Sequence, residues 1–129
     1  SPAITLKNGA RPKSQKSRNK KEMIKFLIQA SYSATGAAAL LKSDSGTERK
    51  KKTELMINEL GGKMESFYYI SNGDAWVICE LPDLASAASI ALKIKASGMG
   101  SISTTVLLET EEVDKAIKLN AGYRYPGSN

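Results

Sequence analysis

The sequence predicts an α+β domain with the ferredoxin-like order βαββαβ, in which helices cover one face of an antiparallel four-stranded sheet. The first observation is a hairpin, because residues 63–71 and 75–81 are strand-like and Asn72-Gly73 lies between them. The second is a pair of further strand-like runs at 24–32 and 101–108. The third is a helical pattern on each side of the hairpin. At 129 residues the chain is long enough for one domain.

The segment before the hairpin begins with residues 24–32, IKFLIQASY, whose loose alternation of apolar side chains is typical of a strand. Residues 35–42 predict a short helical turn. Residues 48–60 predict a longer helix, with the basic run 49–52 on its solvated face. Its apolar stripe is expected to contain Leu55, Met56 and Leu60. Gly61-Gly62 is expected to end this helix.

The segment after the hairpin continues the pattern. Asp83 is the expected N-cap of a helix over residues 84–96, whose many small and apolar side chains predict burial. The fourth strand follows at 101–108. Thr110 is expected to cap a last short helix over residues 111–120.

Apolar residues occupy both faces of the predicted sheet. Strict alternation places Met64, Tyr68 and Ile70 on one face of the second strand, with Phe67 and Tyr69 on the other. Two helices can cover only one face, so the second face predicts a partner surface. Self-association with sheet packed on sheet is one solution. The alternative is that the C-terminal helix folds back over part of this face.

The net charge of +6 is concentrated at the start of the chain. Residues 1–22 hold seven basic residues and one acidic residue, whereas 23–129 hold twelve of each. Segment 1–22 is therefore predicted to be a disordered basic tail and 23–129 the folded domain. The tail has three interpretations: sequence foreign to or upstream of a start at Met23, a transit remnant, or an arm for nucleic acid or membrane surfaces. No aromatic residues interleave with its basic residues, so nucleic-acid binding is not the favoured interpretation.

Composition excludes several kinds of chemistry. The chain has no histidine and one cysteine, so a catalytic triad with histidine and an internal disulfide are impossible within one chain. Neither a metal site nor a cofactor is expected. Cys79 lies in a predicted buried strand and is expected to be a structural thiol. The sequence has no apolar run long enough to span a bilayer and no signal peptide, so a cytoplasmic location is expected.

Several motifs together resemble a known family. They are LIQASY, LGGKMESFYY, the D-x-W-V-I-x-E-L-P-D run, TTVLLETEEVDKA and the closing YR-x-PG. They resemble the GYD domain, a family of small bacterial proteins, over residues 23 to about 127. The resemblance implies a ferredoxin-like fold of the dimeric α/β-barrel type. Where the family has Gly-x-Tyr-Asp, this chain reads Ser-Asn-Gly-Asp, so that Asp74 alone is kept.

Asp74 and the aromatic residues around it are the candidate site. A carboxylate near Trp76 could serve as a general base, or Asp74 could simply build the hairpin turn by accepting backbone hydrogen bonds. Side chains that could line a ligand cleft, or only pack in the core or at a dimer seam, are Tyr32, Tyr68, Tyr69 and Trp76. Arg124 in the C-terminal tail could reach a ligand carboxylate, or the tail could only pack across a neighbouring subunit.

Two functions therefore remain open at this point. The first is a homo-oligomeric module that binds a small organic molecule or has a regulatory or structural role, without chemistry. The second is a cofactor-free enzyme of the monooxygenase or isomerase type, with Asp74 as the base and the aromatic residues as walls. Because this second function is argued mainly from the fold, the first is preferred.

Overall fold

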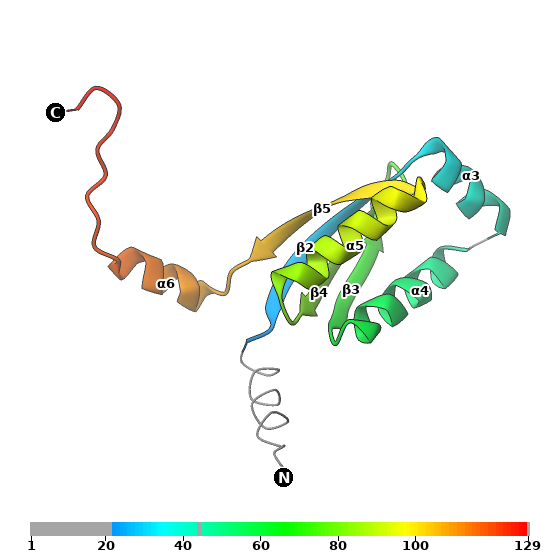
Figure 1. Ribbon diagram of the computed structural model, residues 1–129, viewed down its shortest axis with the longest axis horizontal. Coiled ribbons are helices and arrows are strands. Elements are labelled where there is room, and N and C mark those ends of the chain that lie inside the picture. The colour runs from blue at the N-terminus through cyan, green and yellow to red at the C-terminus, as the bar shows by residue number, and fades with distance from the viewer. Residues whose placement is uncertain (1–21, 44, 129) are drawn as a thin grey trace, which may run out of the picture.

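A computed structural model describes residues 22–43 and 45–128 (Figure 1). The predicted basic tail, apart from Glu22, lies outside these described residues. The elements follow the order β2, α3, α4, β3, β4, α5, β5 and α6. This order is the ferredoxin-like βαββαβ pattern with a C-terminal helix, as predicted, and the helical connection between the first two strands is divided into two helices.

The sheet contains four antiparallel strands in the spatial order β3-β4-β2-β5. Their bounds are Ile24–Tyr32 for β2, Lys63–Tyr69 for β3, Ala75–Leu81 for β4 and Gly100–Leu107 for β5. The two central strands, β2 and β4, come from distant parts of the chain and pair along almost their whole length. This arrangement confirms the predicted fold class.

Helices α3 (Ala34–Ser43), α4 (Gly46–Glu59) and α5 (Leu84–Ser97) lie on one side of the sheet (Figure 1). Helix α4 packs against β3, and α5 packs against β4 and β5. The buried core between helices and sheet consists of Phe26, Ile28, Ile57, Val77, Cys79, Leu81, Ala87 and Ile90. This side of the sheet is called the helix face below, and the opposite side the open face.

The helix ends are set by local hydrogen bonds. Asp83 caps α5 as predicted, because its Oδ1 accepts hydrogen bonds from the Ser86 N–H at 2.8 Å and the Ser86 hydroxyl at 2.7 Å. At the end of α4, the Gly61 N–H donates to Asn58 and the Gly62 N–H donates to Ile57. Gly61 has a φ of 84°, so this pair of bonds is a Schellman motif that requires a left-handed residue. The predicted helix stop is confirmed.

One of the three residues predicted for the apolar stripe of α4 is wrong. Ile57 is fully buried against the sheet, whereas Leu55 is 58% exposed. Met56 and Leu60 pack on the core, as predicted. Leu55 is as hydrophobic as Ile57 but lies about 200° around the helix from it, so the two side chains cannot face the sheet together.

A β-bulge changes which residues of β3 share a face. The pairing register shifts between Met64 and Ser66, so that Met64 lies opposite Cys79 and Phe67 lies opposite Val77. Strict alternation predicted that Met64 shares the face of Tyr68, and this is wrong. The extra residue in the bulge turns Met64 toward the helix face together with Phe67.

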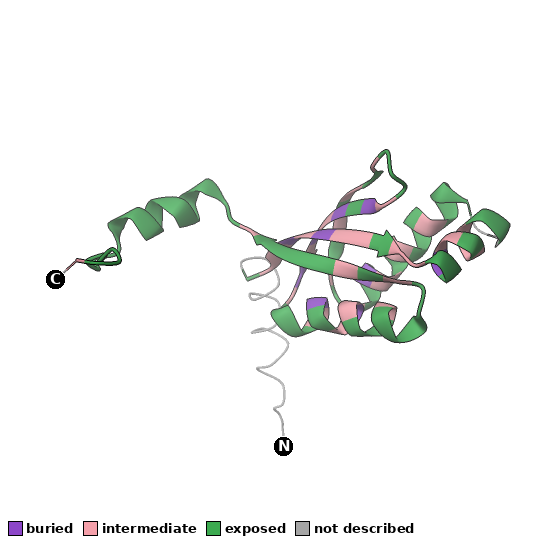
Figure 2. Cartoon of the chain, turned by 90° about the horizontal axis from the view of Figure 1, so that it is seen from above, coloured by how far each residue is buried: buried purple, intermediate pink, exposed green. Residues whose placement is uncertain are grey.

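The C-terminal helix does not cover the open face. Helix α6 (Thr110–Lys118) extends away from the sheet, and none of its residues is buried (Figures 1 and 2). The expectation that it folds back within the chain is therefore wrong. Thr110 is also not its cap: the N-cap position is Glu109, which makes no side-chain cap hydrogen bond.

The phase of α4 gives a first testable prediction. Ile57→Ala should lower the free energy of unfolding by about 2 to 5 kcal/mol, because it leaves a cavity under a fully buried side chain. Leu55→Ala, two residues away, should change it by less than about 0.5 kcal/mol. Urea unfolding followed by circular dichroism measures both. Equal effects of the two substitutions would contradict the helix phase described here.

Candidate functional site

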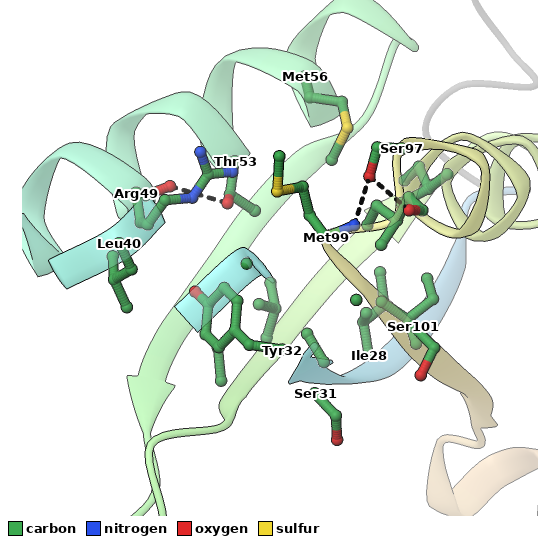
Figure 3. A pocket seen from close by; sticks show the side chains of 18 of the residues that line it. Ile28, Ser31, Tyr32, Leu40, Arg49, Thr53, Met56, Ser97, Met99 and Ser101 are labelled. Atoms are coloured by element: carbon green, nitrogen blue, oxygen red, sulfur yellow. Dashed lines mark hydrogen bonds between the residues drawn. The ribbon is translucent and has the colours of Figure 1, made fainter. Parts of the chain in front are cut away.

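A cavity of about 260 Å³ lies on the helix face, between the three helices and the sheet (Figure 3). All three covering helices and the strands β2 to β5 contribute to its wall. The apolar part of the lining is Ile28, Ala30, Ala39, Leu40, Met56, Ile57, Phe67, Ala75, Val77, Ile90, Ile94, Met99 and Ile102. The cavity is thus mainly a hydrophobic compartment.

The α3 wall is fixed to the loop after α5. Ser33 caps α3, since its hydroxyl accepts a hydrogen bond from the Gly36 N–H at 3.0 Å. The same hydroxyl donates to the Gly98 carbonyl at 2.7 Å, and the Ser33 N–H donates to the Met99 carbonyl at 2.9 Å. A Cβ at Gly36 would lie 1.9 Å from that Met99 oxygen, so only glycine permits this approach. These contacts hold Leu40 and Met99 at the cavity.

Polar groups are few in the lining. The Thr53 hydroxyl donates to the Arg49 carbonyl at 2.8 Å, and the Ser97 hydroxyl donates to the Ile94 carbonyl at 2.6 Å (Figure 3). The Ser97 oxygen also accepts a hydrogen bond from the Met99 N–H. Arg49 supplies a guanidinium group and is the one charged residue among the described residues that line the cavity. Such a compartment suits an apolar molecule with one anionic group.

The structure distributes the predicted site residues over different parts of the molecule. Tyr32 lines the cavity. Tyr68 and Trp76 face each other on the open face, because the register pairs them next to the buried pair of Phe67 and Val77. Arg124 lies in the tail beyond α6. The four predicted aromatic residues therefore do not form one cleft in a single chain.

Tyr69 is the fourth of these aromatic residues and lies on the helix face. Its ring meets that of Phe67 edge to face, with the centroids 5.2 Å apart. Its hydroxyl donates to the Gly46 carbonyl at 3.4 Å, at the start of α4. Tyr69 therefore links the strand edge to α4, in the way expected of an aromatic residue that packs.

Asp74 joins the hairpin to β2. Its Oδ2 accepts a hydrogen bond from the Ser31 hydroxyl at 3.1 Å and one from the Asn72 side-chain amide at 3.4 Å. Asn72, rather than Asp74, supports the turn, because its Oδ1 accepts the Asp74 N–H at 2.9 Å. Gly73, with a φ of 93°, completes a three-residue hairpin loop. Asp74 is not among the residues that line the cavity.

Sequence reasoning missed Arg49 as a site residue. The basic run 49–52 predicts a solvated face, yet Arg49 is half-buried whereas residues 50–52 are exposed. The spacing of Arg49 to Thr53 and Met56 is four and then three residues, which places all three on one helical stripe. This spacing is the signal that the sequence carries, although a charged residue is rarely expected on the inner stripe of a helix.

Neither a metal centre nor a reactive thiol is apparent in the described residues. Within 22–43 and 45–128, no group of three or more His, Cys, Asp and Glu residues is arranged to hold a metal ion. Cys79 is fully buried, and its burial, with a smaller effect of the Glu80 charge, raises the pKa of the thiol to about 11. A thiol with this pKa is a poor nucleophile at neutral pH, as expected for a structural residue.

The fold and the cavity together define a class: a small ferredoxin-like α+β protein with an apolar compartment on the helix face. A sequence profile of the GYD domain matches residues 26–117, which is more than half of the chain. The chain therefore belongs to the GYD domain family, as its motifs predicted. No curated protein and no solved structure matches it. In the part of the chain that is described, no helix is both long and apolar enough to cross a membrane.

The raised pKa of Cys79 gives a second prediction. The folded state favours the neutral thiol, so this contribution to stability is complete below the ordinary pKa near 9 and is lost as the pH rises through about 11. Between pH 8 and pH 11, the free energy of unfolding of wild type should fall by about 2 kcal/mol more than that of Cys79→Ala. Urea unfolding of both proteins at pH 8 and pH 11 measures this difference. Parallel pH profiles would show that Cys79 does not titrate in this way.

Proposed function

We propose that this GYD domain protein is a binding module for a small organic molecule, held in the helix-face cavity without being chemically changed. The ligand class is a compact apolar molecule that carries one carboxylate or similar anionic group. Self-association through the open face accompanies this role. The observation that carries the proposal is an apolar compartment with a single charged lining residue, Arg49, among the described residues.

The size of the cavity supports a compact ligand. A volume of about 260 Å³ lies just below the range of roughly 300 to 1,000 Å³ that is typical of drug-sized ligands. One or two rings, or a short branched chain, would fill it. Because the walls are mainly hydrocarbon, a neutral polar molecule would lose its hydrogen bonds to water without replacement.

Arg49 supports an anionic end group on the ligand. A guanidinium group presents paired N–H donors that match the two oxygens of a carboxylate. The hydroxyls of Thr53 and Ser97 donate to main-chain carbonyls, so their protons are already engaged. The remaining polar side chains of the lining are Ser31, whose hydroxyl donates to Asp74, and Ser101 and Tyr32. The Tyr32 phenol can donate to an oxygen or accept from a hydroxyl.

The enzyme alternative with Asp74 as base receives less support. A general base must come within hydrogen-bond reach of the bound substrate. Asp74 is absent from the cavity lining, and its carboxylate accepts hydrogen bonds from Ser31 and Asn72. Tyr68 and Trp76, the walls in that alternative, lie on the open face.

The test uses a matched pair of probes, 2-naphthoate and 2-naphthalenemethanol, which share the ring system and differ in charge. Arg49→Gln should weaken 2-naphthoate binding by about 10-fold to 100-fold, which corresponds to the loss of one charged hydrogen-bonded pair. It should leave 2-naphthalenemethanol binding within about 3-fold. Isothermal titration calorimetry measures both affinities.

The control variants are Lys50→Gln and Asp74→Ala. Lys50 is exposed, and Lys50→Gln removes one positive charge, as Arg49→Gln does, at the neighbouring position. The affinity for 2-naphthoate should therefore be unchanged. Asp74→Ala should cost about 1 kcal/mol of stability, from its hydrogen bonds to Ser31 and Asn72, with no effect on affinity. Equal losses in Arg49→Gln and Lys50→Gln, or loss of binding in a folded Asp74→Ala protein, would contradict the proposal.

A further inference from the structure

The C-terminal arm, defined here as residues 108–128, contains an amphipathic helix without a partner. In α6, Val113, Ala116 and Ile117 lie on one side, and the charged residues occupy the rest of the surface. No residue of α6 is buried, and Ile117 is 74% exposed. A helix of nine residues is too short to be stable alone in water, and this one has no side-chain N-cap. The helix therefore needs a surface for its apolar side.

The exit point of the arm directs it away from its own sheet. Lys25 on β2 lies 3.3 Å from Glu65 Oε1 on β3 and 3.6 Å from Glu109 Oε2 at the start of the arm. The hydrogen bond and charge of Glu65, with a smaller effect of Glu109, raise the pKa of Lys25. From this point the arm runs outward in both views (Figures 1 and 2). Large apolar side chains along it are exposed: Leu108, Leu119, Tyr123 and Tyr125.

The open face is the second unpartnered surface of the same chain. The register places Leu27 beside Ile78, and Trp76 beside Tyr68, on this face. Tyr68 is 70% exposed and Trp76 is 38% exposed. On β5, Leu107 lies on the same face opposite Lys25, whereas the other residues of that strand on this face, Ser101, Ser103 and Thr105, are polar. Contiguous apolar patches of this kind are uncommon on proteins that act as single copies.

We propose that two copies of this chain exchange their C-terminal arms, so that α6 and the following tail of each copy lie across the open face of the other. Within one chain the arm and the open face are both exposed and point apart. In a two-fold pair each arm contacts the open face of the partner, so that the apolar side of the arm and the open face are both buried. A second copy is therefore a sufficient occupant, and no other protein is required.

The size and composition of the arm fit this role. The arm has about 20 residues, which matches the 20 to 30 residues that each side contributes to a stable interface. Tyr123, Arg124 and Tyr125 are residue types that interfaces favour. The proposal differs from the sheet-on-sheet packing considered from the sequence, since it assigns the cover of each open face to the partner's arm. It does not depend on the proposed ligand, whose cavity lies on the other side of the sheet.

The test begins with the mass of the full chain by light scattering. Wild type should be a dimer. Ile117→Lys on the apolar side of α6, and Tyr68→Lys on the open face, should each raise the dimer dissociation constant by at least about tenfold. Glu111→Gln, which makes the same +1 change on the charged side of α6, should leave it unchanged. Because all three positions are exposed in a single chain, circular dichroism should show the same folded spectrum for each variant.

Mixing the two weakened variants separates arm exchange from any other dimer. The Ile117→Lys copy keeps an intact open face, and the Tyr68→Lys copy keeps an intact arm. A mixture should therefore form heterodimers with one good interface, at concentrations where each variant alone is monomeric. A monomeric wild type, a fully dimeric Ile117→Lys protein, or a mixture that stays monomeric would overturn the proposal.

Discussion

The central strands β2 and β4 have side chains that require burial on both faces of the sheet, whereas the chain provides helices to only one. On the helix face, Phe26 and Cys79 are neighbours in the buried core. One position further along, Leu27 and Ile78 are neighbours on the open face. Since burial of apolar area is the main favourable term in folding, roughly 25 cal/mol per Å², an uncovered second face leaves stabilisation unused. The arm and the open face are two consequences of this constraint.

The helix face shows how the same sheet accommodates a compartment. The bulge in β3 turns Met64 and Phe67 to one side, and Phe67 reaches the cavity wall. The contact between Gly36 and the Met99 carbonyl holds α3 against the opposite wall. These two local irregularities, one in a strand and one at a helix start, shape the compartment around Arg49. The cavity and the open face are thus separated by the thickness of the sheet.

The sequence predicted the strands, the start of α5, the end of α4 and the apolar second face, because these follow from local periodicity, Asp83 capping and the Gly61-Gly62 stop. It did not predict the position of Met64, since a bulge changes the face of a residue without changing the pattern of the strand. Arg49 was missed because its burial depends on how α4 packs, which is a tertiary property. Asp74, the aspartate that the family motif singled out, has hydrogen bonds that explain it as a link between the hairpin and β2. Longer-range contacts decided each of these cases.

Trp76 is the sole tryptophan of the chain and lies on the open face, so its fluorescence reports directly on what covers that face. The most direct measurement is Trp76 emission with acrylamide quenching, first across a dilution series and then with saturating cyclohexanecarboxylate added. This compact apolar carboxylate does not absorb at the tryptophan excitation wavelength. The account predicts a red shift and stronger quenching on dilution, as the partner leaves, and no change with ligand at a fixed protein concentration. An emission that is independent of concentration, or that responds to the ligand without a change in mass, would contradict the separation of the two surfaces.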